Sequence, residues 1–167
     1  MPAGYNMRQQ YNTVSVFDLD GVVIDSTHRY RTKDHNGDKV IDLQHWRENE
    51  HLATHDKLLP HADIYRKALT VKSKLVIVAT AREMKEPDFS YIRDNLGQPD
   101  AMVYRKINDT RKGSALKIEG IEKVLHVASV KIDPRKMIVY EDNHNYLRDI
   151  CQHFKCVGVY VPSDQGY

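Results

Sequence analysis

The stretch VFDLDGVVIDS, residues 16–26, joins a short apolar run to three carboxylates. Val16 and Phe17 end a run that indicates a buried strand, and Asp18 and Asp20 follow at once. Like charges this close repel each other, and burying them costs several kcal/mol unless a positive charge lies between them. The pair is therefore a solvated turn, part of a calcium-binding loop, or a site that holds a cation and does chemistry.

Composition predicts a globular protein of one domain, residues 1–167, with a core of its own. No apolar run has transmembrane length, and the first thirteen residues lack the apolar core of a signal peptide. Cys151 and Cys156 suggest neither a disulfide framework nor a zinc site. We therefore expect a cytoplasmic location, reduced thiols and no membrane association. The net charge of +2 supports no general claim about nucleic acid.

Runs rich in Val and Ile alternate with helical patterns along the chain. The predicted strands are Val14–Phe17, Leu75–Ala79, Ala101–Tyr104, Met137–Tyr140 and Val157–Val161, and the predicted helices are Ala62–Val71, Asp88–Asn95, Ser114–Val130 and His144–Phe154. Continuously apolar strands are typical of a parallel sheet that is covered on both faces. The alternation predicts an α/β fold, a Rossmann-like parallel sheet with helices on both faces.

The segment 27–59 is the exception, because it is polar, rich in His and weakly periodic. Asn36-Gly37 is a strong signal for a type I′ turn, so we expect a small β-hairpin there. We interpret the segment as a small insertion or flap over one end of the sheet, with no large cap domain. Trp46 within it either stacks a base or packs the flap onto the core.

Polar residues follow three of the predicted strands. In a parallel α/β sheet, ligands bind beyond the carboxyl ends of the strands. The groups there are Asp18 to Gly21, Thr80 to Arg82 and Glu141 to Asn143, and the basic cluster NDTRKGS, residues 108–114, precedes a helix. Carboxylates, a hydroxyl and cationic side chains converging on one rim suit a divalent cation and a phosphoryl group.

The order DxDGV, T-x-R, Lys and an acidic pair resembles the four motifs of the haloacid dehalogenase (HAD) superfamily of phosphotransferases. A closer resemblance is to the 3′-phosphatase domain of phage-type polynucleotide kinases. It rests on DTRK from Asp109, on IVYEDN and VGVYV, and on Arg29, eleven residues after Asp18. The resemblance implies the HAD fold and a phosphatase that uses Mg²⁺.

The resemblance also implies a role for each matching residue. Asp18 is the expected nucleophile and Asp20 the expected acid and base. The expected Mg²⁺ ligands are Asp18, the main-chain carbonyl of Asp20, and Asp142. Thr80 and Lys112 are expected to hydrogen-bond the phosphoryl oxygens. The candidate substrate-binding residues are Arg29, Arg82, Gly21, Asp109 and Arg111.

Several of these assignments have alternatives. Thr80 and Arg82 could be a helix cap and a solvated charge. Lys106 and Arg111 compete with Lys112 for the role of phosphate-binding cation. Glu141 is either a second acid of the metal site or a solvated neighbour. Asp109 could cap the helix that follows or orient Lys112.

The function predicted first is removal of 3′-phosphates from polynucleotide ends through an aspartyl-phosphate intermediate. The alternative is a phosphatase of free nucleoside or deoxynucleoside monophosphates, or of another small phosphate ester. A second alternative is a non-catalytic module that binds nucleotides or nucleic-acid ends. The intact pair of Asp18 and Asp20 counts against that module, since binding alone needs no nucleophile.

Overall fold

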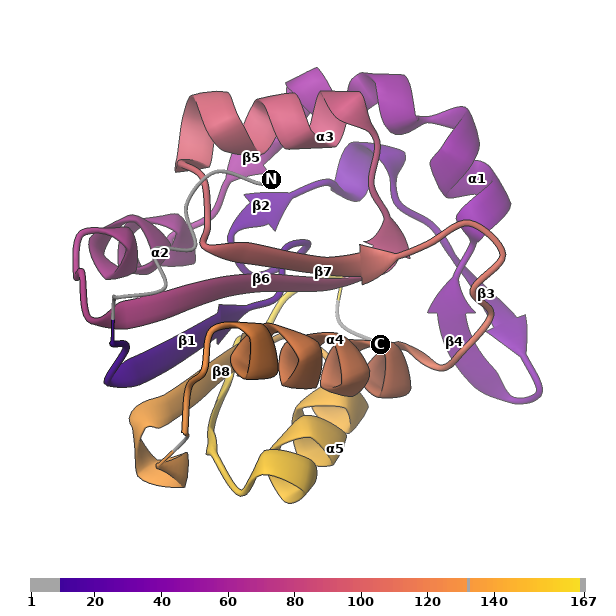
Figure 1. The fold of residues 1–167 in the computed structure, drawn as a ribbon. Helices are drawn as coiled ribbons and strands as arrows, with labels where there is room; N and C mark the ends of the chain where they lie inside the picture. The colour runs from indigo at the N-terminus through magenta and orange to yellow at the C-terminus, as the bar shows by residue number, and fades with distance from the viewer. Residues whose placement is uncertain (1–9, 132, 166–167) are drawn as a thin grey trace.

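A computed structural model describes residues 10–131 and 133–165 of the chain. A sheet of five parallel strands lies at its centre, in the order β7-β6-β1-β8-β9 (Figure 1). The strands are β1 (Thr13–Phe17), β6 (Lys74–Glu83), β7 (Ala101–Arg105), β8 (Met137–Glu141) and β9 (Val157–Tyr160). The first strand is therefore central, with β6 on one side and β8 on the other.

Helices cover both faces of this sheet (Figure 1). One face packs against α2 (His61–Leu69) and against α3 (Glu86–Tyr91), which continues into a π-helical turn (Ile92–Leu96). The other face packs against α4 (Gly113–Val127) and α5 (His144–Phe154). A short 3₁₀ turn (Pro134–Lys136) precedes β8.

The apolar core divides between the two faces because neighbouring residues of a strand point to opposite sides. In β1, Phe17 packs with Tyr65 of α2 on one face. Val16 packs with Leu116 of α4 and Ile150 of α5 on the other. Strands covered in this way need apolar residues at successive positions, which explains the runs seen in the sequence.

The predicted α/β class, the parallel sheet and the helices on both faces are confirmed. Most predicted strands and helices differ from the observed ones by one to three residues at their ends. The exception is β6, which continues four residues beyond Ala79, through Thr80 and Arg82. These two residues thus belong to a strand, and the alternative of a helix cap is wrong.

The segment 27–59 forms a small structured insertion. Its elements are a 3₁₀ turn (Thr27–Arg29), the hairpin strands β3 (Thr32–His35) and β4 (Asp38–Ile41), α1 (Leu43–Glu48), a 3₁₀ stretch (Glu50–His55) and β5 (Lys57–Leu58), which pairs with β2 (Ile24–Asp25). The hairpin and α1 lie together at one side of the molecule (Figure 1). No large cap domain occurs within the described ranges, as predicted.

The hairpin turn is the one that the sequence predicts. Asn36 and Gly37 have φ angles of 51° and 84°. Two successive positive φ angles are characteristic of a type I′ turn, which matches the right-handed twist of the two strands. His35 and Asp38 pair across the turn.

Within the described residues, no helix is both long and apolar enough to cross a membrane. The expectations of one domain over residues 1–167 and of no signal peptide include residues 1–9, which lie outside the described residues. Both therefore stay predictions.

Candidate active site

Residues from β6, from β8 and from the loop after β1 come together at one edge of the sheet, beyond the carboxyl end of β1. Because β1 lies between β6 and β8, Asp18 lies near both Thr80 and Asp142. This is the edge at which parallel α/β sheets bind ligands. A pocket there is lined by Asp18, Asp20, Tyr30, Ile41, Thr80, Ala81, Arg82, Lys117, Asp142, Asn143, Tyr146 and Gln165.

Three buried carboxylates, which we call the acidic group, come together at this pocket: Asp18, Glu141 and Asp142. One oxygen from each lies within 4.8 Å of the others. Lys117 of α4 reaches the group, with its Nζ atom 3.0 Å from Asp18 Oδ1 and 2.5 Å from Glu141 Oε1. Lys117 thus brings one buried positive charge to a group of three carboxylates.

The pKa values in the acidic group reflect this excess of negative charge. Burial, and then the charge of Asp18, raise the pKa of Asp142 to about 8. The same two causes raise the pKa of Glu141 well above its usual range. Burial also acts to raise the pKa of Asp18, but the charge of Lys117 and hydrogen bonds outweigh it and hold that pKa below its usual value. Asp18 is therefore favoured as an anion.

The acidic group fits a divalent metal ion in both chemistry and charge. Carboxylate oxygens are the ligands that Mg²⁺ prefers in proteins. If all three carboxylates are ionised, Lys117 leaves a deficit of two positive charges, which one divalent ion supplies. Within the described ranges this is the one group of three or more potential ligands close enough to share an ion.

Gly21 provides space for this group. Its φ angle is +80°, and a Cβ atom on it would lie 2.2 Å from Asp142 Oδ2 and 2.5 Å from Ser163 Oγ. Its amide donates a hydrogen bond to the Ile24 carbonyl at 2.8 Å. The geometry therefore gives Gly21 a use other than the predicted contact with substrate, because its amide is already taken.

We predict that Gly21→Ala lowers kcat about 100-fold, since displacement of a reacting group by about 1 Å can have that effect. The φ angle alone costs about 1–2 kcal/mol of stability for a residue with a Cβ atom. Gly37→Ala is the matched control, because Gly37 has a φ of +84° but open space around its Cβ position. Kinetics and thermal unfolding of both variants separate the effects: equal activity in the two would contradict the steric argument.

Asp20 is held through both of its carboxylate oxygens. Ser26 Oγ donates to Oδ1 at 2.7 Å, and Arg82 Nε donates to Oδ2 at 2.6 Å. Gln165 donates in turn to Ser26 Oγ at 2.9 Å. The side chain that the sequence predicts as acid and base thus has one fixed orientation at the pocket.

The C-terminal part of the described chain also reaches the acidic group. Ser163 Oγ donates to Asp142 Oδ2 at 2.6 Å, and the Gln165 amide donates to Ser163 Oγ at 3.0 Å. Gln165 is 4% exposed. Through Ser163 and Gln165 this segment joins the environments of Asp142 and Asp20, which no motif in the sequence indicates.

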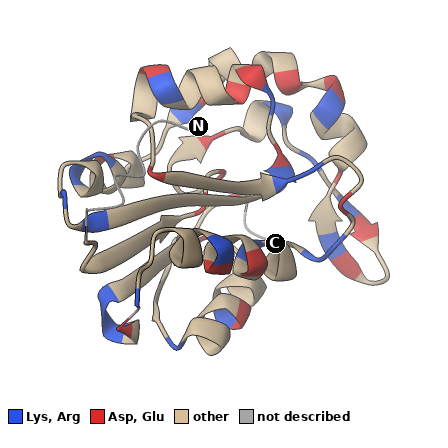
Figure 2. Ribbon diagram, in the orientation of Figure 1, with Lys and Arg blue, Asp and Glu red and all other residues tan. Residues whose placement is uncertain are grey.

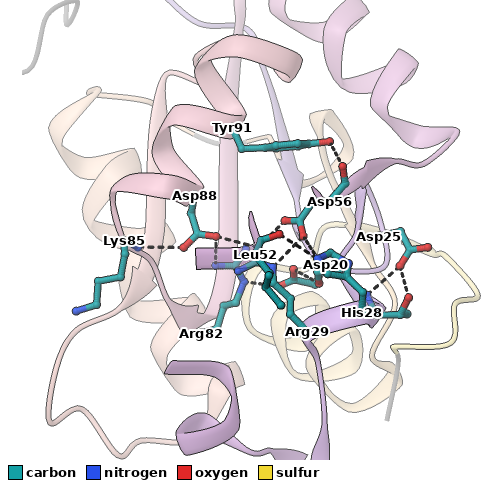
Figure 3. A network of polar contacts seen from close by, with 12 residues as sticks. Asp20, Asp25, His28, Arg29, Leu52, Asp56, Arg82, Lys85, Asp88 and Tyr91 are labelled. Carbon is teal, nitrogen blue, oxygen red and sulfur yellow. Dashed lines mark hydrogen bonds and ion pairs between the residues drawn. The ribbon is translucent and has the colours of Figure 1, made fainter. Parts of the chain in front are cut away.

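Arg29 lies away from the pocket, contrary to its predicted contact with substrate. It is fully buried, and its guanidinium group pairs with Asp56 at 2.5 Å and with Asp88 at 2.9 Å (Figure 3). Arg82, in contrast, lines the pocket and pairs with Asp20. The structure thus separates two arginines to which the sequence assigned one role.

Lys112, the lysine predicted for the site, is also placed elsewhere. Its side chain is 61% exposed, and its Nζ atom lies 3.3 Å from Asp149 of α5. The predicted Asp109 and Arg111 pair with each other at 2.7 Å, and neither lines the pocket. Lys117 occupies the place that the prediction gave to Lys112, and Asp109 accepts from the Arg111 amide in the loop before α4.

A helical pattern could have revealed Lys117. The buried positions of α4 include Ser114, Lys117, Ile121 and Leu125, which share one face at helical spacing. A lysine on an apolar helix face needs an acidic partner, so its position marks Lys117 as a candidate residue of the site. Asp56 and Asp88 carried no comparable signal, because each is buried by residues distant in the sequence.

The sequence of residues 7–106, more than half of the chain, matches the family described as Bacteriophage T5 5′-deoxynucleotidase. The match includes Asp18, Asp20, Thr80 and Arg82, and it ends before Lys117. No curated protein matches the sequence.

Solved structures resemble the fold at low sequence identity. A haloacid dehalogenase-like hydrolase from Streptococcus pneumoniae has a TM-score of 0.63 and 13% identity over 91% of this chain and 87% of its own. A chain of a Pnkp1/Rnl/Hen1 complex has a TM-score of 0.64 and 19% identity over 91% of this chain, which spans just under half of its length (46%).

A third resemblance is to the D,D-heptose 1,7-bisphosphate phosphatase from B. bronchiseptica, solved with magnesium and phosphate. Its TM-score is 0.52, with 16% identity over 87% of this chain and 78% of its own. These likenesses establish the fold, and the match over residues 7–106 establishes the family. The chain therefore belongs to the bacteriophage T5 5′-deoxynucleotidase family and is a phosphatase with the haloacid dehalogenase fold.

Proposed function

We propose that the protein is a Mg²⁺-dependent 5′-deoxynucleotidase, which hydrolyses the phosphate ester of deoxynucleoside 5′-monophosphates. The observation that carries this proposal is the acidic group with Lys117, at a pocket that Asp20 and Arg82 also line. The family match supports a nucleotide as the substrate.

Asp18 and Asp20 divide the chemistry between them in this proposal. An oxygen of Asp18 attacks phosphorus, the bond from phosphorus to the ester oxygen breaks, and that oxygen takes a proton from Asp20, which enters this step as the neutral acid. Water then attacks the phosphorus of the aspartyl-phosphate and gives a proton to Asp20. The bond to Asp18 breaks, phosphate leaves, and both side chains return to their first state.

Cationic and hydroxyl groups around Asp18 suit the phosphoryl oxygens. Lys117 Nζ lies 3.0 Å from Asp18, and Thr80 is buried in the lining of the same pocket. Arg82 lines the pocket, and its Nη2 is buried without a hydrogen-bond partner among the described residues, so we assign it as a donor to a phosphate oxygen. Donors fixed in a buried site stabilise the charge that develops in the transition state.

The residues that would hold Mg²⁺ are Asp18, Asp142 and the main-chain carbonyl of Asp20. When bound, Mg²⁺ supplies positive charge that lets an anionic nucleophile approach an anionic phosphate. We assign Glu141 a different role, because its Oε1 accepts from Lys117 and its Oε2 accepts from the Asp142 amide at 2.9 Å. Glu141 would hold these two groups in place.

Three features support a mononucleotide as the substrate in preference to the end of a polynucleotide. The expectation of a 3′-phosphate end depended on the DTRK stretch, on the lack of a large cap and on Arg29 as a substrate ligand, and Arg29 is buried against two aspartates. Binding a strand also requires Lys and Arg contacts to several phosphates. Figure 2 shows Lys and Arg positions interspersed with Asp and Glu. Tyr30 and Ile41 from the insertion line the pocket and offer a surface for one nucleoside.

A substrate comparison tests this function. We expect kcat/KM for deoxynucleoside 5′-monophosphates to exceed that for a 3′-phosphorylated oligonucleotide by about tenfold or more, a difference of about 1.4 kcal/mol in transition-state binding. A nucleoside 3′-monophosphate and p-nitrophenyl phosphate complete the series. EDTA should remove the activity, and added Mg²⁺ should restore it.

A preference for the 3′-phosphorylated oligonucleotide would instead identify a polynucleotide 3′-phosphatase. If every ester were still hydrolysed in EDTA, the proposed dependence on Mg²⁺ would be wrong. Absence of hydrolysis with all four substrates would leave a binding module.

A further inference from the structure

A chain of buried ion pairs leads from the insertion to Asp20 (Figure 3). Arg29 binds Asp56 through Nε at 2.8 Å and Asp88 through Nη2 at 2.9 Å. The same oxygen of Asp88 lies 3.2 Å from Arg82 Nη1. Arg82 Nε then reaches Asp20 at 2.6 Å. Two guanidinium groups therefore alternate with three carboxylates, of which Asp20 alone lines the pocket.

Trp46 lies against both guanidinium groups. The Cζ atoms of Arg29 and Arg82 are 4.1 and 4.2 Å from the centre of its ring. The ring is 1% exposed, so the predicted alternative of packing is confirmed and that of stacking a base is wrong in this arrangement. A cation over an aromatic face is attracted more strongly when water is excluded. Trp46 thus supports the two arginines at once.

The partners of Asp88 leave it little freedom. Its Oδ2 accepts from the Lys85 amide at 3.0 Å, at the start of α3, while Oδ1 faces the two arginines. Asp56 is fixed on the other side by the bidentate contact with Arg29. The long side chain of Arg82 has many rotamers in water, but here its ring contact and its ion pairs select one.

We propose that Arg29 and Trp46 are positioning residues, which act through Asp88 and Arg82 to fix the Asp20 carboxylate for proton transfer to the leaving group. The inference rests on the proposed phosphatase chemistry. Neither residue touches the substrate: Arg29 is fully buried, and neither it nor Trp46 lines the pocket. Through Arg29 and Trp46 the insertion therefore contributes to catalysis by contacts that do not involve the substrate.

The leaving group distinguishes positioning from a merely structural role. Proton donation by a well-placed acid contributes about 10²–10⁴-fold in rate. An alkyl oxygen needs that proton, whereas p-nitrophenolate leaves without it. A misplaced Asp20 should therefore slow the first step, in which the leaving group departs, far more for a deoxynucleotide than for p-nitrophenyl phosphate, whereas the second step is common to both substrates. General loss of structure should impair both substrates alike.

The test uses Arg29→Met, Arg29→Lys, Trp46→Leu and Trp46→Phe in the full chain, with Asp20→Asn as the reference. We expect Arg29→Met and Trp46→Leu to lower the single-turnover rate of leaving-group release about 100-fold for a deoxynucleoside 5′-monophosphate and less than about tenfold for p-nitrophenyl phosphate. Asp20→Asn should show the same imbalance. Trp46→Phe keeps an aromatic face and should retain most activity, and Arg29→Lys keeps charge but loses the bidentate contact.

Arg31→Ala is the matched control from the same insertion. Its side chain is 63% exposed and pairs with Asp42 at 3.3 Å, so we expect no change in either rate. Trp46 is the one tryptophan of the chain, so its fluorescence reports in the arginine variants whether the ring stays buried.

Equal losses on the two substrates in variants that unfold at the wild-type temperature would overturn the positioning role, and so would unchanged kinetics. Should Arg29→Met not fold, Arg29→Lys and Trp46→Leu carry the same comparison. A wild-type protein inactive on both esters would refute the proposed function itself, which is a different result from either outcome.

Discussion

We expect Asp18→Asn to remove turnover and to leave the protein folded. An amide cannot form the acyl-phosphate that the proposed reaction requires, and loss of a nucleophile typically lowers kcat by about 10⁴-fold or more. The fold should tolerate the change because Asp18 is one of three crowded carboxylates. Lys117 also pairs with Glu141 at 2.5 Å, and this contact does not involve Asp18.

Thermal unfolding and steady-state kinetics on the same preparation check this result. We expect a melting temperature close to that of the wild type, because loss of the ion pair with Lys117 opposes the relief of repulsion with Glu141 and Asp142. Full activity in purified Asp18→Asn would refute the aspartyl-phosphate mechanism. A collapse of stability would show instead that the charge of Asp18 holds Lys117 in place.

Lys117→Met should be costly for both stability and activity. It removes the buried cation that pairs with both Asp18 and Glu141. Loss of one partner from a buried ion pair costs about 3–5 kcal/mol, because the remaining charges lie uncompensated. Loss of a donor to the phosphoryl group should lower kcat about 10²–10³-fold. Added Mg²⁺ should raise the melting temperature of this variant, since a bound ion replaces the missing charge.

Lys112→Met is the matched control, five residues earlier in the chain. Its exposed ion pair with Asp149 contributes about 1 kcal/mol or less. We expect wild-type kinetics and nearly wild-type stability. The opposite pattern, in which Lys112→Met is inactive and Lys117→Met is not, would restore the assignment made from the sequence.

The sheet could be predicted because it depends on short apolar runs that are local in the sequence. Burial on both faces requires continuous apolar runs such as Leu75–Ala79, and such runs are visible in a sequence. The extension of β6 through Arg82 could not be predicted in this way. Arg82 is 2% exposed, and its burial depends on Asp20 and Asp88, whose proximity only the folded chain creates.

The same distinction applies to the candidate site. Asp18, Asp20 and Asp142 could be predicted to lie together, because Asp18 and Asp142 directly follow β1 and β8, Asp20 comes two residues after Asp18, and the topology brings the ends of these strands together. Whether Arg29 or Lys112 contacts the substrate depends on the direction in which its long side chain points. That choice is decided by distant partners, as the pair of Arg29 with Asp88 shows.

The insertion also has consequences for how this enzyme could diversify. Its hairpin is mostly exposed, and a Cβ atom on Gly37 would meet nothing within 4 Å. Its other half buries Arg29 and Trp46 against the chain of ion pairs. Extra residues at Asn36–Gly37 can therefore be accepted without disturbing the chemistry, as exposed loop tips usually allow. The half of the insertion that buries Arg29 and Trp46 can change only together with Arg82. New specificities can therefore evolve at the hairpin turn while this buried half stays constant.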